Sequence, residues 1–142
     1  MSTEQINTPK FTWIILIVIG VVDLIRGFMH TVMIRYAAAN FAMLDLSVAA
    51  DDQMFLLGVF GISNYLTGVL FIIIGLKARQ IAPVVLAAIP VVYAMGTIIL
   101  NANVTPQSEF LGKGFMIVYL AVCAVTAIAS FVVMAIQKRC RQ

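Results

Sequence analysis

The sequence is poor in charge, in cysteine and in histidine, and each shortage excludes a class of protein. Only 11% of the 142 residues are charged. A soluble domain carries about 25% charged residues, so a soluble globular domain is excluded. The two cysteines, Cys123 and Cys140, are expected to lie about half a membrane apart, which excludes a disulfide between them. One histidine and no Cys-x-x-Cys spacing provide no pattern for a zinc or haem site, so we expect neither a metal nor a cofactor.

Long apolar runs are what the sequence has in abundance. Hydrophobic residues make up 63% of the chain, and a helix needs about 20 of them in succession to cross the hydrocarbon core of a bilayer. The sequence therefore predicts an all-α integral membrane protein, a four-transmembrane-helix bundle. We expect one transmembrane domain over residues 11–136 between short tails at 1–10 and 137–142, with helices at about 11–35, 53–76, 81–100 and 110–136.

The distribution of charge predicts the orientation of the bundle. The basic residues gather in the two tails and in the turn that holds Lys77 and Arg79, whereas the segment 37–52 carries three aspartates. By the positive-inside rule, both termini then lie in the cytoplasm, an N-in/C-in topology in a bacterial inner (plasma) membrane. The acidic segment is too polar to span, although a short surface helix is possible within it. The small net charge of +3 is typical of membrane orientation rather than of a nucleic-acid surface.

Three ionisable residues interrupt the first apolar run: Asp23, Arg26 and His30. Their spacing of i, i+3 and i+7 places them on one face of a helix. A charge at this depth is costly unless it is paired or hydrated, so it marks a candidate functional site. The alternative is that Asp23 and Arg26 form an ion pair within the helix that only orients it. His30 has a comparable alternative, as a hydrogen-bonding residue with no further role.

The second predicted helix carries Gly61, Gly68 and Gly75 at intervals of seven residues. Helices in lipid pack closely where side chains are small, so these glycines predict a helix-packing seam, within the bundle or between copies of the chain. Asn64 lies in the centre of the seam and is either an interhelical hydrogen-bonding group or a ligand of a cavity. We predict an outward-facing polar pocket lined by Asp23, Arg26, His30, Asn64, Tyr93 and Tyr119.

These features favour a protein that binds or moves a small solute, an ion or a proton through the pocket, as an oligomer. The alternative is a non-catalytic accessory or assembly subunit, or a lipid-binding protein, of a larger membrane complex. An intramembrane enzyme is the third possibility, but no catalytic motif supports it and we assign no catalytic residues. The expected partners are membrane lipid and either a second copy of the chain or other subunits, with no nucleic acid.

Overall fold

A computed structural model of the chain describes residues 8–104 and 112–140, and within them every regular element is helical. Four helices are long and apolar enough to cross a membrane, which confirms the predicted all-α, four-span architecture. The predicted start of the last helix at 110, and residues 1–7 and 141–142 of the tails, lie outside the described residues. The elements are α1 (Lys10–Thr31), α2 (Ile34–Asn40), α3 (Ala50–Lys77), the short 3-10 helix η1 (Arg79–Ile81), α4 (Ala82–Asn103) and α5 (Gly112–Arg139).

The first spanning helix ends at Thr31, four residues earlier than the sequence predicts. Met33 leaves the helical conformation, with φ −101° and ψ 34°, and its amide donates to the carbonyl of Phe28 at 3.3 Å. The Thr31 hydroxyl donates to the carbonyl of Gly27 at 2.8 Å, a contact that commonly bends helices. The chain then turns into α2, which is the short helix expected in this connection and begins slightly earlier than expected.

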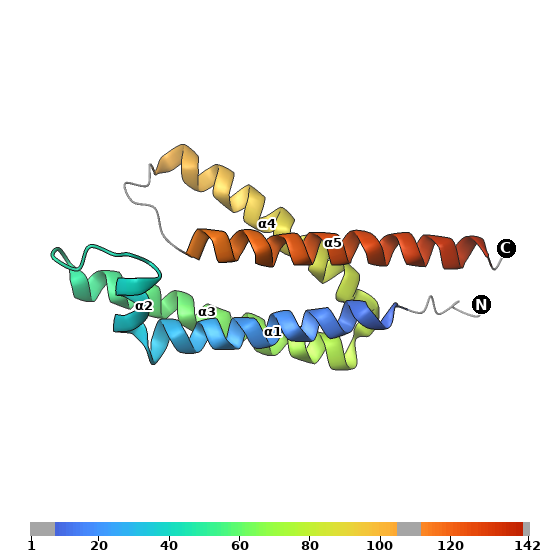
Figure 1. Cartoon of the computed structure of the whole chain (residues 1–142), viewed down its shortest axis with the longest axis horizontal. Helices are drawn as coiled ribbons and strands as arrows, with labels where there is room; N and C mark the ends of the chain where they lie inside the picture. Colours follow the sequence, from blue (N-terminus) through green and yellow to red (C-terminus); the bar gives the residue numbers. More distant parts are fainter. Residues whose placement is uncertain (1–7, 105–111, 141–142) are drawn as a thin grey trace.

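The spanning helices form two antiparallel pairs, α1 with α3 and α4 with α5 (Figure 1). The start of α1, the end of α5 and the α3–α4 turn lie at one end of the molecule, and α2 lies at the other (Figure 1). A buried apolar cluster joins α1 to the second pair. Its members are Leu16, Ile19, Ala82, Leu86, Tyr119, Cys123 and Ala127. Beyond this cluster α4 diverges from the other helices (Figure 1), and residues 94–104 are all exposed.

The glycines of α3 face α1, and the two backbones approach closely. A Cβ atom built on Gly68 would lie 2.7 Å from the carbonyl oxygen of Gly20. A Cβ on Gly61 would lie 2.8 Å from the Cβ of His30, and one on Gly75 would lie 2.5 Å from a side-chain carbon of Ile17. A larger residue at any of these positions requires the contacting side chain or backbone of α1 to shift. The close approach presses the face of α1 that carries Asp23 and His30 against α3.

Candidate functional site

Asp23 lies where α1, α3 and α5 meet. It is only 3% exposed. Its Oδ2 atom accepts two hydrogen bonds, from the hydroxyl of Thr67 on α3 at 3.0 Å and from the hydroxyl of Tyr119 on α5 at 3.2 Å. One carboxylate oxygen therefore connects α1 to a helix of each pair.

Arg26 lies one turn further along α1 and faces the other carboxylate oxygen. Its Nη1 atom is 3.5 Å from Oδ1 of Asp23, longer than the ~2.7–2.9 Å of a strong charge-assisted hydrogen bond. The guanidinium also lies 5.7 Å from the ring centroid of Phe60 and 5.7 Å from that of Tyr119. A cation within about 6 Å of an aromatic face is attracted to it. Two aromatic rings and a long ion pair thus hold Arg26, whose side chain is 15% exposed.

His30 and Asn64 form the next contact along the α1–α3 interface. The Nδ2 atom of Asn64 lies 3.4 Å from Nδ1 of His30. An amide nitrogen only donates, so this contact requires the tautomer in which Nδ1 of His30 carries no proton. The His30 ring also packs against Phe60, with 5.6 Å between ring centroids. Asn64 itself is 6% exposed.

The Thr67 hydroxyl has two acceptors within reach, and it has only one proton to donate. Besides Asp23, it lies 3.1 Å from the backbone carbonyl oxygen of Asn64. A hydroxyl can donate to one acceptor at a time while it accepts from another donor. Thr67 can therefore change partners without moving when the charge on Asp23 changes.

The structure links five of the six residues expected in the pocket and leaves one apart. Asp23, Arg26 and Tyr119 are in mutual contact, and Phe60 connects Arg26 to His30, which contacts Asn64. Tyr93 is half-buried on α4, and among the described residues its hydroxyl makes no hydrogen bond. We refer to Asp23, Arg26, His30, Asn64, Phe60, Thr67 and Tyr119 as the Asp23 cluster.

The sequence did not predict two members of the Asp23 cluster, Thr67 and Phe60. A signal for both was present, because Phe60, Asn64 and Thr67 follow one another at intervals of four and three residues and so share a face of α3. Threonine and phenylalanine are both common in spanning helices, so neither residue alone indicates a site. Only their shared helix face with Asn64 would have predicted them.

A second buried polar contact joins α1 to α5 near the start of α1. The Ser130 hydroxyl donates to the carbonyl of Thr126 at 2.6 Å, and it lies 2.6 Å from the hydroxyl of Thr12. Because Ser130 has already used its only proton, Thr12 is the donor between the two hydroxyls. This contact satisfies all three polar groups and fixes packing.

The chemistry available to the Asp23 cluster is the uptake and release of a proton on a carboxylate beside a fixed cation. Within residues 8–104 and 112–140, no group of three His, Cys, Asp or Glu residues is arranged to hold a metal ion. Cys123 and Cys140 are both free, the first buried and the second exposed. The sequence matches no protein-family model, and neither a curated protein nor a solved structure is significantly similar to it.

Proposed function

We propose that this four-span protein binds and moves a proton, or a small solute or ion coupled to it, with Asp23 as the proton-binding group. One observation carries the proposal: a carboxylate that is 3% exposed bridges three spanning helices beside an arginine at the long distance of 3.5 Å. Intramembrane carboxylates in such places serve as proton carriers in pumps and transporters.

Protonation of Asp23 would change its contacts to every helix at the junction. A proton taken up at Oδ1 removes the negative charge that attracts Arg26, whose guanidinium stays between Phe60 and Tyr119. The hydrogen bonds to Oδ2 then lose their charge assistance, which accounts for about half of their strength. Thr67 is free to donate to the carbonyl of Asn64 instead. Proton binding would in this way loosen α1 from α3 and α5 together.

The charge pattern supports an orientation in which the His30 end of the Asp23 cluster faces outward. The end of the molecule that carries the last turn of α5, with Lys138 and Arg139, and the Lys77/Arg79 turn is basic. The start of α3 lies at the opposite end (Figure 1), with Asp51 and Asp52 in its first turn and Asp45 in the segment before it. By the positive-inside rule, the basic end would lie on the cytoplasmic side of the membrane. Asp23 then lies near the middle of the bilayer and His30 lies about 10 Å closer to the outer face, at 1.5 Å of rise per residue.

Proton binding and proton movement can be tested separately. In infrared difference spectra of the purified chain across a pH titration, the carbonyl band of a protonated, buried carboxyl should be present in the wild type and absent in Asp23→Asn. In proteoliposomes with an internal pH-sensitive dye, an imposed potential should drive acidification that Asp23→Asn abolishes. Asp52→Asn, which removes an exposed carboxylate on α3, is the control and should keep both signals. Wild-type spectra and flux in Asp23→Asn would overturn the proposal.

A second candidate function, as a subunit that assembles with another chain, is favoured by the outer half of α4. Residues 94–104 are exposed on every side of the helix, and a Cβ built on Gly96 would meet nothing within 4 Å. A small residue on a spanning helix allows a second helix to approach closely. Disulfide cross-linking of Gly96→Cys in native membranes tests this candidate, with Val132→Cys on α5 as the exposed comparison. A cross-linked product specific to Gly96→Cys would support assembly, and equal yields at both positions would count against it.

A further inference from the structure

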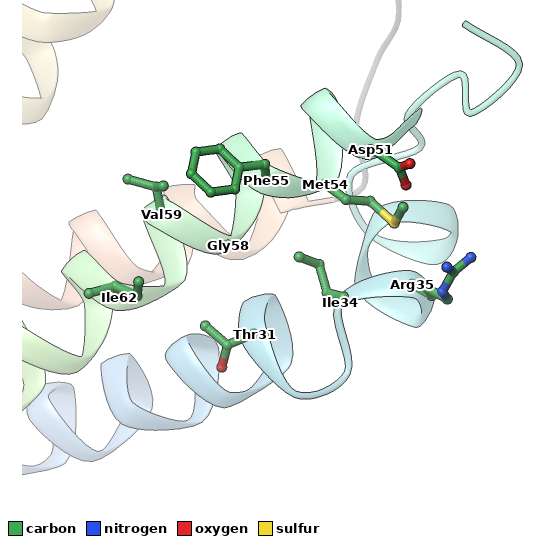
Figure 2. A pocket seen from close by; sticks show the side chains of 9 residues that line it. All are labelled: Thr31, Ile34, Arg35, Asp51, Met54, Phe55, Gly58, Val59 and Ile62. Carbon is green, nitrogen blue, oxygen red and sulfur yellow. The ribbon is translucent and has the colours of Figure 1, made fainter. Parts of the chain in front are cut away.

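A separate groove, with a volume of about 450 Å³, lies between the α1–α2 bend and the start of α3. Most of the residues that line it are apolar, and Figure 2 shows Ile34, Phe55, Val59 and Ile62 around it. Two features of the chain create it. The chain leaves α1 after Thr31 and turns into α2. Gly58 provides no side chain at the wall of the groove, and a Cβ there would lie 3.4 Å from Cδ1 of Ile34.

Two residues of opposite charge lie at one end of this groove. Arg35 comes from α2 and Asp51 from the first turn of α3, and both are exposed. Figure 2 shows them at the same end, with the apolar side chains extending away from them. They do not form an ion pair with each other. The groove therefore presents a cation and an anion at one end of a mostly apolar surface, near the ends of the spanning helices, where lipid headgroups are expected.

This arrangement complements one class of membrane lipid, and we propose that the groove binds a phospholipid with a primary-amine headgroup, such as phosphatidylethanolamine. The guanidinium of Arg35 pairs with the phosphate, for which its fork of N–H donors is well suited. The carboxylate of Asp51 accepts hydrogen bonds from the ammonium group. The upper part of an acyl chain lies against Ile34, Phe55 and Val59. This site is separate from the Asp23 cluster and does not depend on the function proposed for that cluster.

The same chemistry predicts which lipids bind poorly. Phosphatidylcholine presents a quaternary ammonium with no N–H group, so Asp51 receives no hydrogen bond from it. Phosphatidylglycerol has a net negative charge and no cation to pair with Asp51. Both retain the phosphate contact to Arg35, so the discrimination depends on Asp51, whereas Arg35 contributes to the binding of all three lipids.

Native mass spectrometry of the full chain with synthetic phosphatidylethanolamine, phosphatidylcholine and phosphatidylglycerol of identical acyl chains tests the proposal. The wild type should retain phosphatidylethanolamine about tenfold better than the other two, as expected for one charge-assisted hydrogen bond. Asp51→Asn should remove the preference, and Arg35→Gln should weaken the binding of all three lipids. Asp52→Asn and Lys113→Gln change exposed charges that do not line the groove and should leave the preference intact.

Filling the groove provides an independent check. Gly58→Leu places a side chain where the acyl chain is proposed to lie and should reduce retention of phosphatidylethanolamine, with an unchanged far-ultraviolet circular dichroism spectrum showing that the helices remain. Arg35 and Asp51 are exposed, so their variants keep the test decisive if Gly58→Leu does not fold. Equal retention of the three lipids by the wild type, or an unchanged preference in Asp51→Asn, would overturn the proposal.

Discussion

The hydroxyl of Tyr119 donates a hydrogen bond to Oδ2 of Asp23 at 3.2 Å, although 96 positions separate the two residues in the chain. This contact and the contact between Thr12 and Ser130 are buried polar links from α1 to α5. Between them lies the apolar cluster around Leu16 and Cys123. The second helix pair is thus attached to α1 by hydrogen bonds at two depths, and one of these depends on a group that can change its charge.

Removing the hydroxyl of Tyr119 should weaken this attachment. Tyr119→Phe keeps the ring beside Arg26 but deletes the hydrogen bond to Asp23, so we expect the free energy of unfolding in detergent to fall by about 1–2 kcal/mol. Tyr93→Phe is the matched control, because among the described residues the Tyr93 hydroxyl makes no hydrogen bond. Its free energy of unfolding should stay within about 0.5 kcal/mol of the wild type. Equal losses in the two variants would contradict a specific contact.

The closest approach of α1 and α3 provides a second prediction. In Gly68→Ala, the new Cβ would lie 2.7 Å from the backbone oxygen of Gly20, which cannot move without the helix. We expect the free energy of unfolding to fall by about 1–3 kcal/mol, as for overpacking in a tight core. Gly96→Ala is the matched control, because its Cβ meets nothing within 4 Å. It should instead stabilise the chain by up to about 1 kcal/mol, since alanine is the better helix former. Thermal melts of both variants in one detergent measure the difference.

The sequence predicts the four spans and the shared face of Asp23 and Arg26, since apolar length and helical periodicity are local properties. The choice of partner across helices is not local, because it depends on how each helix is rotated about its axis. For this reason the contact of Asn64 with His30, rather than with Asp23, emerges only from the structure. No glycine or proline directly follows Thr31 to predict that α1 ends there. The hydrogen bond from the Thr31 hydroxyl to the carbonyl of Gly27 is seen only in the folded helix.

The loop before α3 should respond to acid through Asp45. The amide and the hydroxyl of Ser47 both donate to Oδ1 of Asp45, at 2.9 and 2.5 Å. These bonds favour the charged carboxylate and lower the pKa of Asp45 below its ordinary value. The two hydrogen bonds from Ser47 therefore order the loop at a pH above the ordinary pKa of Asp45. This ordering is lost as the pH falls through the lowered pKa of Asp45.

Ser47→Ala removes the hydroxyl donor, so the pKa of Asp45 should rise towards its ordinary value. Carboxyl carbon shifts followed by NMR across a pH titration measure the change. Ser63→Ala is the control, because Ser63 bonds to the carbonyl of Val59 on α3 and not to Asp45. A pKa of Asp45 that is the same in Ser47→Ala and in the wild type would show that the hydroxyl does not stabilise the carboxylate.

The only tryptophan reports on the opposite end of the molecule, where the α3–α4 turn meets the start of α1. The guanidinium carbon of Arg79 lies 4.2 Å from the ring centroid of Trp13 and covers one face of the indole. Such a contact at an exposed site is worth about 0.5–1 kcal/mol.

Arg79→Gln shortens the side chain and removes the charge, so acrylamide should quench the fluorescence of Trp13 more strongly than in the wild type. Lys77→Gln removes a neighbouring charge that makes no such contact and should leave the quenching constant unchanged. If Arg79→Gln were quenched no more than the wild type, this pair would not hold the turn against α1, and the position of α4 would depend on the apolar cluster and on its packing against α5.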